Sequence, residues 1–479
     1  MNIAETIVGK KNGPLNKTAI IDQDQTITYE TLFKEVALLR AELSALGVSD
    51  YKKVALYAED SIEYIIVSLA VLLCNGVIVP VSPSLAWDEA QNVMDAIDVH
   101  FLIAAEKIGF HKKLTRLKTI KCNRREMSFY RRAIKNEAPK EYYALNPAFI
   151  RFSSGTTGAS KGVVLSHDSI IERIDAANKG LNITECDHII WVLSMTYHFV
   201  VTILLFLRER ATIILCEKEF PFTLFDALKK YSCTFLYASP FHYRMISLDK
   251  QTLRGKLSNI RLAISTAVEF SKEEIGLFHD AFGCAVKEAY GIIEVGLPFI
   301  NLSHDLKARG SVGKILPDYD IQILNKDDEG VGAIYLRGKG MFDAYYSPWK
   351  MREKVLVDGW FYTGDIGFLD ENNYLFIKGR EKNVINFSGM KIFPAEVEAV
   401  LNSHPKVRES FVYGVSHPVY GQLPQADVIW IDESRNSNAL PELRKFCYDH
   451  MASYKVPKKI SFVDKIKKTA SGKISRSNV

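Results

Sequence analysis

Hydrophobic residues recur along the N-terminal part of the chain in short blocks whose spacing alternates between helical and extended. Apolar residues at helical spacing predict a helix that begins at Thr28, a capping residue, and ends at Gly47. The pattern then predicts strands at residues 54–57, 77–81 and 100–104, and helices at residues 61–75 and 87–97. Strands that alternate with helices are typical of a largely parallel sheet whose faces are covered by helices.

Further along, the α/β pattern continues and then changes. A helix at residues 167–179 and strands at residues 189–193, 212–216 and 235–238 extend it. A β-rich portion follows from Gly310, with strands at residues 320–324 and 332–337. The last part predicts helices at residues 394–401 and 440–451 and strands at residues 409–415 and 426–431. Residues 106–140 are charged and poorly patterned, and we expect surface helix and loop there.

Composition narrows the class of protein. A length of 479 residues is too great for one ordinary core, and 47% hydrophobic with 24% charged residues is typical of a soluble globular protein. The net charge of +5 is small, and no basic stripe with interleaved aromatic residues indicates nucleic-acid binding. The seven cysteines are scattered without a C-x-x-C pair, which favours reduced thiols in the cytoplasm over a disulfide framework or a zinc site.

Neither a signal peptide nor a membrane span is predicted. The N-terminus lacks a basic region followed by an apolar core. The most apolar helix candidate, residues 62–74, contains Glu63 and is shorter than the ~20 residues that a span needs. We therefore expect a soluble, cytoplasmic protein.

Residues 150–165 carry the strongest chemical signal. An apolar run leads into residues 153–162, which are glycines, small or hydroxylated residues and Lys161, and an apolar extended run follows. Glycines allow close approach of the backbone to a ligand, hydroxyls donate hydrogen bonds and the lysine adds a cation, so this strand–loop–strand suits a polyphosphate. It is not a Walker A loop, because Ser160 and Gly162 replace the required glycine and hydroxyl. An isolated Gly-Thr-Thr-Gly would be read as a solvated turn.

This decapeptide resembles the phosphate-binding loop of the adenylate-forming superfamily, which includes acyl-CoA and aryl-CoA ligases, peptide-synthetase adenylation domains and beetle luciferases. The resemblance implies that ATP is bound by Ser153, Ser154, Gly155, Thr156, Thr157, Gly158 and Lys161, with Thr156 and Lys161 also acting in catalysis. It also implies an α/β fold with a large N-terminal domain of two parallel-sheet α/β subdomains plus a β-barrel-like subdomain. A small mobile C-terminal α+β domain would follow.

Glu288 to Glu294 is similar to the superfamily's Tyr-Gly-x-Thr-Glu. The resemblance implies that Tyr290 stacks on adenine and that Glu294 ligates Mg²⁺, a cation that prefers oxygen ligands. The apolar setting of Glu294 also favours a paired or metal-bound carboxylate over a surface acid. The sequence departs from the family at Ile293, where a threonine usually contacts the α-phosphate, and at Thr266, where glycine is common beside adenine.

Three later motifs follow in family order. Tyr362-Thr363-Gly364-Asp365 implies that Asp365 holds the ribose hydroxyls, a role that suits an acceptor-only carboxylate. Residues 379–398 imply that Arg380 contacts the ribose, that Lys382 is the hinge between domains and that the loop around Gly389 serves thioester formation. The terminal Ser-Gly-Lys implies that Lys473 contacts the reacting oxygens. We place the domain boundary between residues 379 and 380, giving domains 1–379 and 380–479.

The acid-binding pocket is expected, by the same resemblance, to be lined by His198, Phe199, Tyr237, Ser239, Ser265, Ala267 and Gly291. A lone His-aromatic pair is more often core packing. Relatives that adenylate amino acids have an aspartate near the His198 position, and no aspartate stands there in this sequence. We therefore expect an aryl or short-to-medium acyl acid without an α-amino group.

The resemblance implies an AMP-forming acid–thiol ligase. The acid carboxylate would attack the α-phosphorus of ATP to give an acyl-adenylate and pyrophosphate, and the acyl group would pass to CoA or to the phosphopantetheine of a separate carrier protein. Catalysis would need closure of the small domain, and a basic surface from Lys455 to Lys468 would guide the acceptor or merely aid solubility. A luciferase-like oxygenase and a degenerate, non-enzymatic nucleotide-binding protein remain open, as does the oligomeric state.

Overall fold

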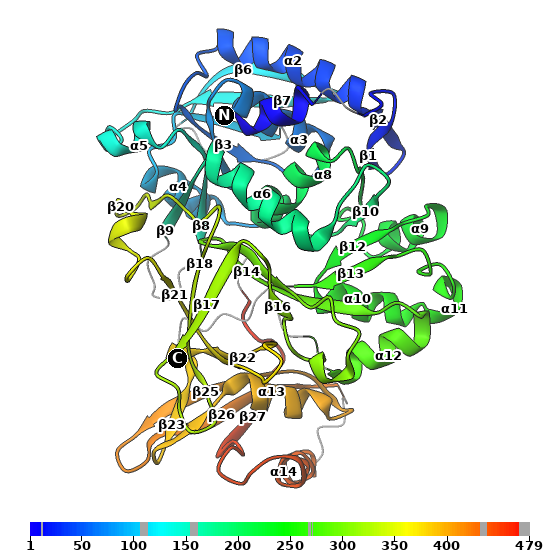
Figure 1. Cartoon of the computed structure of the whole chain (residues 1–479), viewed down its shortest axis with the longest axis vertical. Coiled ribbons are helices and arrows are strands. Elements are labelled where there is room, and N and C mark those ends of the chain that lie inside the picture. The colour runs from blue at the N-terminus through cyan, green and yellow to red at the C-terminus, as the bar shows by residue number, and fades with distance from the viewer. Residues whose placement is uncertain are drawn as a thin grey trace. The chain divides into compact units, whose positions relative to one another are not determined.

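A computed structural model of the chain describes residues 1–10, 13–105, 114–153, 161–266, 270, 272–431 and 438–468 (Figure 1). The chain divides into two compact units, the first comprising Met1–Asp320 with Arg337–Gly359 and the second comprising Ile321–Leu336 with Trp360–Val479. Each unit is described by itself.

The strands of the first unit form two nine-stranded sheets. Those of one sheet are β1 (Thr18–Asp22), β2 (Gln25–Thr28), β10 (His188–Trp191), β11 (Thr212–Leu215), β12 (Phe235–Ala238), β13 (Leu262–Ser265), β14 (Val286–Ile292), β15 (Gly296–Ile300) and β16 (Lys314–Ile315). Their order is β16-β15-β14-β13-β12-β10-β11-β1-β2. The central pairs from β14 to β1 are parallel, and the outer pairs are antiparallel.

The other sheet carries the strands that flank the phosphate loop. Its strands are β3 (Lys53–Tyr57), β4 (Val77–Val81), β5 (Phe101–Ala105), β6 (Thr115–Cys122), β7 (Arg125–Arg131), β8 (Pro147–Ser153), β9 (Lys161–Ser166), β19 (Ala344–Tyr345) and β20 (Lys350–Met351). Their order is β20-β19-β9-β8-β4-β3-β5-β7-β6. The strands β5, β3, β4 and β8 are parallel, and antiparallel strands extend both sides.

Helices connect and cover these sheets. They are α1 (Ile3–Val8), α2 (Tyr29–Ala45), α3 (Ile62–Leu73), α4 (Trp87–Ala96), α5 (Lys140–Ala144), α6 (His167–Leu181), α7 (Met195–His198), the π-helical turn η1 (Phe199–Ile203), α8 (Leu204–Arg208), α9 (Phe222–Lys230), α10 (Pro240–Leu248), α11 (Lys250–Leu253) and α12 (Lys272–Phe282), with 3₁₀ turns η2 (Leu306–Ala308) and η3 (Arg352–Lys354). As predicted, Thr28 caps α2, and its side chain accepts a hydrogen bond from Thr31 N at 3.2 Å.

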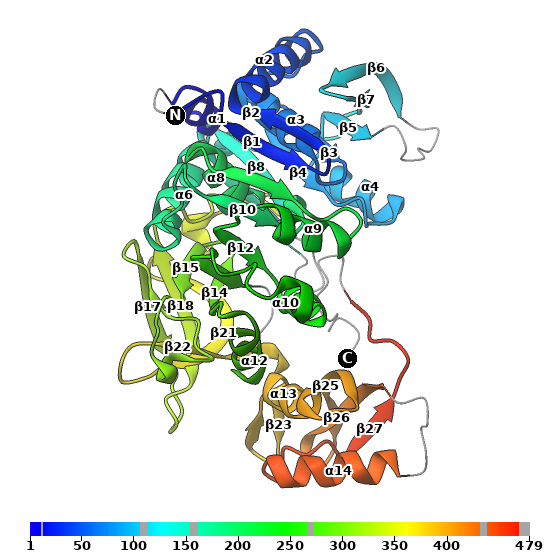
Figure 2. The ribbon, with the colours of Figure 1, turned by 90° about the vertical axis from the view of Figure 1, so that its right-hand side faces the viewer.

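One large apolar core lies between the first nine-stranded sheet and the helices α9 to α12. Apolar residues of α9, α10, α11 and α12 pack with residues of β10, β12, β13 and β14, as Figure 1 and Figure 2 show for the ribbons. Helix α6 instead contacts β8 and β9 of one sheet and β15 of the other. Its Gly180 permits this packing, because a Cβ there would lie 2.9 Å from both Ile300 and Leu316.

The prediction of surface helix and loop for residues 106–140 is wrong for most of its described part. Residues 115–122 and 125–131 form the hairpin β6–β7, which adds to β5, and the short helix α5 begins at Lys140, the last residue of the segment. The exposed face of β6 carries charged residues, which hides the alternation that signals a strand. The informative signal is Asn123, which takes the left-handed conformation (φ 51°) in the tight turn.

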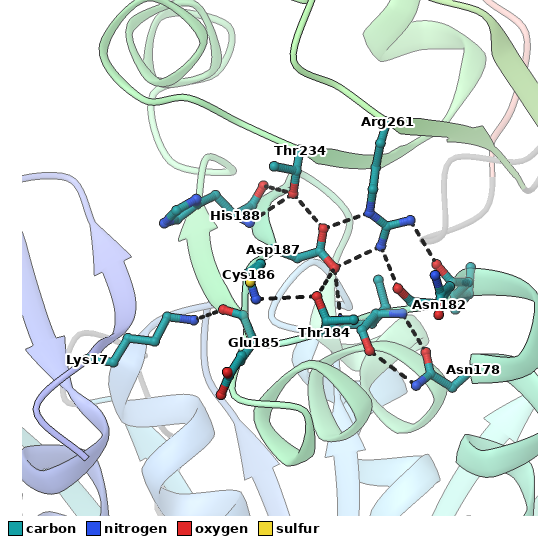
Figure 3. A network of polar contacts seen from close by, with 12 residues as sticks. Lys17, Asn178, Asn182, Thr184, Glu185, Cys186, Asp187, His188, Thr234 and Arg261 are labelled. Carbon is teal, nitrogen blue, oxygen red and sulfur yellow. Dashed lines mark hydrogen bonds and ion pairs between the residues drawn. The ribbon is translucent and has the colours of Figure 1, made fainter. Parts of the chain in front are cut away.

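A polar network fixes the ends of β10, β12 and β13 (Figure 3). Asp187 accepts hydrogen bonds from Arg261 Nε at 2.8 Å, Thr234 Oγ1 at 2.7 Å and Thr184 N at 2.9 Å. Arg261 also donates to the carbonyls of Leu181 and Asn182 at the end of α6. Burial opposes ionisation of Asp187, but the bonds from Arg261, Thr234 and Thr184 outweigh it and lower the pKa of this carboxyl.

The second unit contains a four-stranded and a five-stranded sheet. The elements are β17 (Tyr319–Leu324), which begins in the first unit, β18 (Gly332–Gly338), β21 (Phe361–Leu369), β22 (Leu375–Arg380), η4 (Glu381–Asn383), β23 (Ile385–Phe387), β24 (Met390–Ile392), α13 (Pro394–Ser403), β25 (Val407–His417), β26 (Gly421–Trp430), α14 (Ala439–His450) and β27 (Lys459–Phe462). The orders are β17-β18-β21-β22 and β24-β23-β26-β25 with β27 beside β26. Apolar residues of α13 and α14 form a core with β25, β26 and β27. The predicted helices and strands of this part are therefore confirmed.

Candidate active site

The strands around the phosphate loop lie as predicted. Strands β8 and β9 pair antiparallel, with Phe152 opposite Gly162 and Ser153 opposite Lys161. Lys161 therefore begins β9, and its Nζ lies 4.8 Å from the ring centroid of Tyr345. The predicted ATP-binding residues Ser154, Gly155, Thr156, Thr157 and Gly158 lie outside the described residues, as does the side chain of Ser153.

The Tyr-Gly…Glu motif forms the hairpin β14–β15. Tyr290 pairs with Phe299, and Glu294 occupies the turn between the strands. Gly291 is required by close approach, because a Cβ on it would lie 2.5 Å from the carbonyl oxygen of Gly296. The motif glycine thus allows the narrow hairpin that carries Glu294.

Glu294 is held by a residue that the sequence analysis missed. The Tyr345 hydroxyl donates a hydrogen bond to Glu294 Oε1 at 3.1 Å, and the Phe342 amide donates to the Glu294 carbonyl at 2.8 Å. Burial and the Glu294 carboxylate raise the pKa of Tyr345, so its hydroxyl keeps its proton at neutral pH. The paired carboxylate expected from the apolar surroundings of Glu294 is therefore present.

Two arginines, also missed by the sequence analysis, place positive charge around this carboxylate. Arg151 on β8 donates to the Tyr197 carbonyl, and Arg173 on α6 donates to the carbonyls of Ile293 at 2.7 Å and Gly340 at 2.8 Å. Burial lowers the pKa of each arginine to about 10, and the Glu294 carboxylate opposes that shift. The backbone at Ile293, the position of the family's threonine, is thus fixed by Arg173.

His198 and Tyr237, two of the predicted pocket residues, lie close to each other, and both are near Trp191. Their ring centroids are 6.4 Å apart, and Trp191 lies 6.3 Å from His198 and 6.2 Å from Tyr237. The Trp191 and Tyr237 rings are nearly parallel, at 15°. We call His198, Trp191 and Tyr237 the aromatic cluster. Its members come from β10, β12 and α7, so sequence spacing alone does not bring them together.

The other predicted pocket residues are placed differently. Phe199 is only 2% exposed and packs on Tyr64 at 5.8 Å. Ser239 directly precedes helix α10 as its N-cap, and its Oγ lies 2.8 Å from His242 Nδ1. Ser265 ends β13 with a buried hydroxyl that has no hydrogen-bond partner among the described residues. Gly291 lies in the hairpin described above, and Ala267 lies outside the described residues.

The expectation that no aspartate lies near His198 is wrong for the folded chain. An aspartate does stand at the His198 helix, because Asp60, distant in sequence, accepts a hydrogen bond from Met195 N at 2.7 Å. Asp60 is 4% exposed, and the charge of Glu217 acts on its carboxyl. Burial and the Glu217 charge raise the pKa of Asp60, so the structure favours its protonated form. A protonated, internally bonded carboxyl fits a helix cap better than an ammonium receptor.

In the second unit the structure pairs the two predicted ribose ligands. Asp365 and Arg380 are register partners on β21 and β22, and Arg380 Nε lies 2.8 Å from Asp365 Oδ1. Arg380 also donates to the Thr363 carbonyl at 2.8 Å, and the Thr363 hydroxyl accepts from Asp365 N at 3.0 Å. Gly364 between them takes a left-handed conformation, φ 73°, which glycine adopts at little cost.

The predicted hinge and thioesterification residues lie nearby in sequence. Lys382 is in η4, directly after β22, and burial and the Arg380 charge lower its pKa. Ser388 and Gly389 both have positive φ, 48° and 81°, in the tight turn between β23 and β24. Lys473 lies outside the described residues.

Comparison with known proteins identifies the family. Residues 9–346 match the AMP-binding enzyme family, and residues 396–473 match the AMP-binding enzyme C-terminal domain. This chain belongs to the AMP-binding enzyme family. The predicted membership of the adenylate-forming superfamily is therefore confirmed, and the chain is a member of an enzyme family.

The relatives of this AMP-binding enzyme include CoA ligases. A long-chain-fatty-acid–CoA ligase from Haemophilus influenzae is 30% identical over 72% of this chain and 63% of its own length. A 2-succinylbenzoate–CoA ligase from Bacillus cereus is 28% identical over 96% of this chain and 94% of its own length. The chain spans less than two thirds of the length of the first of these and of a 4-coumarate–CoA ligase from Oryza sativa.

Solved structures confirm the predicted fold class. The o-succinylbenzoate CoA synthetase from Bacillus subtilis, in complex with its acyl-adenylate intermediate, has a TM-score of 0.85 with 23% identity. The match covers 100% of this chain and 97% of that structure. None of the helices within the described residues has both the length and the apolar character that a bilayer crossing requires.

Proposed function

We propose that this AMP-binding enzyme is an AMP-forming acid–thiol ligase. The substrate carboxylate oxygen attacks the α-phosphorus of ATP, the bond to pyrophosphate breaks, and the acyl-adenylate then transfers its acyl group to a thiol with release of AMP. The match of both residues 9–346 and residues 396–473 to the AMP-binding enzyme family carries the proposal. We retain the domain boundary between residues 379 and 380 as part of it, one residue before β22 ends at Arg380.

The side chains of the site supply charge and position rather than a nucleophile. Lys161 and the loop hydroxyls of Thr156 and Thr157 would contact the phosphates, Tyr290 the adenine, and Asp365 with Arg380 the ribose. Lys473 would contact the reacting oxygens, where an aimed cation contributes on the order of 3 kcal/mol to transition-state stabilisation. The pairing of Asp365 with Arg380 supports this division, because it fixes the carboxylate that must accept hydrogen bonds from two hydroxyls.

A magnesium ion fits the acidic residue of the site. Glu294 offers carboxylate oxygen, and within the described ranges no group of three His, Cys, Asp or Glu residues could hold a metal. One carboxylate plus phosphate oxygens is a common way to bind Mg²⁺, so Glu294 would hold it together with ATP. When bound, the ion would compensate the phosphate charge.

The acid substrate is proposed to be an aryl or short-to-medium acyl acid without an α-amino group. The aromatic cluster supports an aryl acid, because His198, its half-exposed member, packs on the buried rings of Trp191 and Tyr237, and an aryl group can pack on such aromatic residues. Asp60 supports the absence of an amino group, since its carboxyl is bonded within the protein and favours the neutral form.

The thiol acceptor is proposed to be CoA, and the phosphopantetheine of a separate carrier protein is the alternative. CoA is favoured because relatives of the chain are CoA ligases by name. Lys382 would be the hinge for the second half-reaction, and the turn at Gly389 would approach the thiol. We place the activity in the cytoplasm.

Acid-dependent exchange between ATP and labelled pyrophosphate tests the proposal. The panel should hold aryl acids, straight-chain acids of increasing length and amino acids, each with Mg²⁺ present. We expect exchange with aryl or short-to-medium acids and none with amino acids. Absence of exchange with every acid, despite ATP binding, would favour a non-enzymatic nucleotide-binding protein. Light emission with a luciferin would favour the oxygenase.

A further inference from the structure

Residues 342–346, here called the bridging segment, join the two charged motifs of the first unit. Asp343 N donates to the Val164 carbonyl at 2.9 Å, and Tyr346 N donates to the Gly162 carbonyl at 2.7 Å, so the segment is fixed along β9. On its other side, Phe342 N donates to the Glu294 carbonyl at 2.8 Å. The segment thus holds the strand of Lys161 and the turn of Glu294 to each other.

Tyr345 is the side chain of this segment that contacts both charges. The Lys161 ammonium lies 4.8 Å from the ring centroid, within the range of a cation–π interaction. The hydroxyl donates to Glu294 Oε1 at 3.1 Å. Tyr345 is 7% exposed and packs on Phe342 at 4.8 Å, so its ring has little freedom to move.

A tyrosine contacts both groups here and carries no charge of its own at neutral pH. A lysine and a glutamate brought into direct contact attract each other strongly in a partly buried site. Such an ion pair would have to be broken before phosphates and a metal ion could use the two groups. The ring face of Tyr345 stabilises the Lys161 ammonium and its hydroxyl stabilises the Glu294 carboxylate, so one uncharged side chain orients both groups.

We propose that Tyr345 is a positioning residue of the nucleotide site, which sets Lys161 for the phosphates and Glu294 for the metal ion before ATP binds. The ligand in this inference, ATP with a metal ion, is taken from the proposed function. The contacts that carry it do not depend on that function.

Calorimetry on the full chain with an ATP analogue that has a methylene group between the α- and β-phosphorus tests the inference. Tyr345→Phe keeps the ring and removes the hydroxyl that holds Glu294. We expect about tenfold weaker binding with Mg²⁺ and a change of less than about twofold with EDTA, since a hydrogen bond to a charged group contributes that much. Tyr345→Leu also removes the ring and should weaken binding about fivefold in EDTA, through Lys161.

The matched control is Tyr346→Phe. Tyr346 is the next residue of the same segment, but its hydroxyl contacts Lys53 in the apolar core on the other face of the sheet. This control should bind the analogue like the wild type under both conditions. In the Glu294→Gln background, Tyr345→Phe should cause no further loss with Mg²⁺. Equal losses with Mg²⁺ and EDTA, full additivity with Glu294→Gln, or the same loss in Tyr346→Phe would each overturn the inference.

A second measurement separates this inference from the proposed function. If the wild type bound no nucleotide, the proposed function would fail, but urea unfolding of Tyr345→Phe, Glu294→Gln and the double variant would still report the contact. Non-additive changes in the free energy of unfolding would support the positioning role. Additive changes would overturn it.

Discussion

Arg380 Nε lies 2.8 Å from Asp365 Oδ1, and the two residues face each other across the β21–β22 ladder. The side chain of Asp365 is 7% exposed and that of Arg380 is 36% exposed. The arginine therefore fixes the orientation of a carboxylate that is almost buried. An ionised carboxylate can accept from one guanidinium and still accept from two hydroxyls, which is what a ribose offers.

Asp365→Asn should weaken nucleotide binding through the ribose. Two hydrogen bonds to a charged acceptor contribute about 3 kcal/mol together, so we expect about a hundredfold loss of ATP affinity. Calorimetry with ATP and with 2′,3′-dideoxy-ATP checks the cause. The wild type should lose a similar factor on the dideoxy compound, whereas Asp365→Asn should bind both nucleotides about equally. A variant that still discriminates between them would contradict the role of Asp365.

Strongly periodic elements of this chain were predictable from sequence alone. The strand at residues 235–238 is β12 with the same bounds, because its uninterrupted apolar run reflects burial on both faces. Residues 115–131 were missed, because charges on the exposed face of β6 mask the alternation of a strand. Local pattern reports burial, and the edge strand β6 buries only Ile120 and Cys122.

The site was predictable only where a motif names its residues. Resemblance selected Asp365 and Arg380 separately, and the structure adds that they form an ion pair. Tyr345 and Asp60 could not be found this way, since their contacts to Glu294 and Met195 join segments far apart in sequence. Contacts of this kind follow from the packing of the sheets, which no local pattern encodes.

Lys473→Ala should separate the two half-reactions. The lysine is proposed to compensate charge only while the carboxylate attacks the α-phosphorus, so adenylate formation should fall by at least about a hundredfold. Transfer from a preformed acyl-adenylate to CoA should stay within a few-fold of the wild type. Single-turnover measurements of each step, with product quantified by chromatography, provide the check. Equal loss in both steps would show that Lys473 does not act in adenylation alone.

The basic surface from Lys455 to Lys468 makes a prediction about the acceptor. Lys455 and Lys468 are engaged by Glu396 at 2.7 Å and Glu409 at 2.8 Å, whereas Lys465 and Lys467 are exposed. If this surface guides the phosphates of CoA or an acidic carrier protein, kcat/KM for thioester formation should fall as salt is raised, and adenylate formation should not. The double variant Lys465→Glu with Lys467→Glu should reduce that salt dependence. A salt-independent second step would leave the surface as a solubilising face.

Gly291→Ala should destabilise the hairpin that carries Tyr290 and Glu294. Its Cβ would lie 2.5 Å from the Gly296 carbonyl oxygen, and such overpacking costs about 1–3 kcal/mol. Urea unfolding measures the loss, and ATP affinity should fall with it. Gly276→Ala is the control, because a Cβ there meets nothing within 4 Å on helix α12 and alanine favours a helix. Equal effects of the two changes would contradict the close-approach argument.

The Asp187 network predicts how stability depends on pH. The pKa of Asp187 is lowered in the folded protein, so its contribution is present above the unfolded pKa of about 3.9 and disappears as pH falls through the lowered folded value. Asp187→Asn should therefore lower the free energy of unfolding by about 2 kcal/mol at pH 7, because the hydrogen bonds to an almost buried carboxylate become bonds to a neutral amide. The difference from the wild type should shrink as pH falls below about 4. Asp320→Asn, in the exposed pair with Arg337 at 2.9 Å, is the control and should cost less than about 1 kcal/mol. Urea unfolding of the wild type and the two variants across this pH range measures these differences in the free energy of unfolding. If the loss of stability in Asp187→Asn did not change with pH, the network would stabilise the fold through packing rather than through the ionised carboxylate.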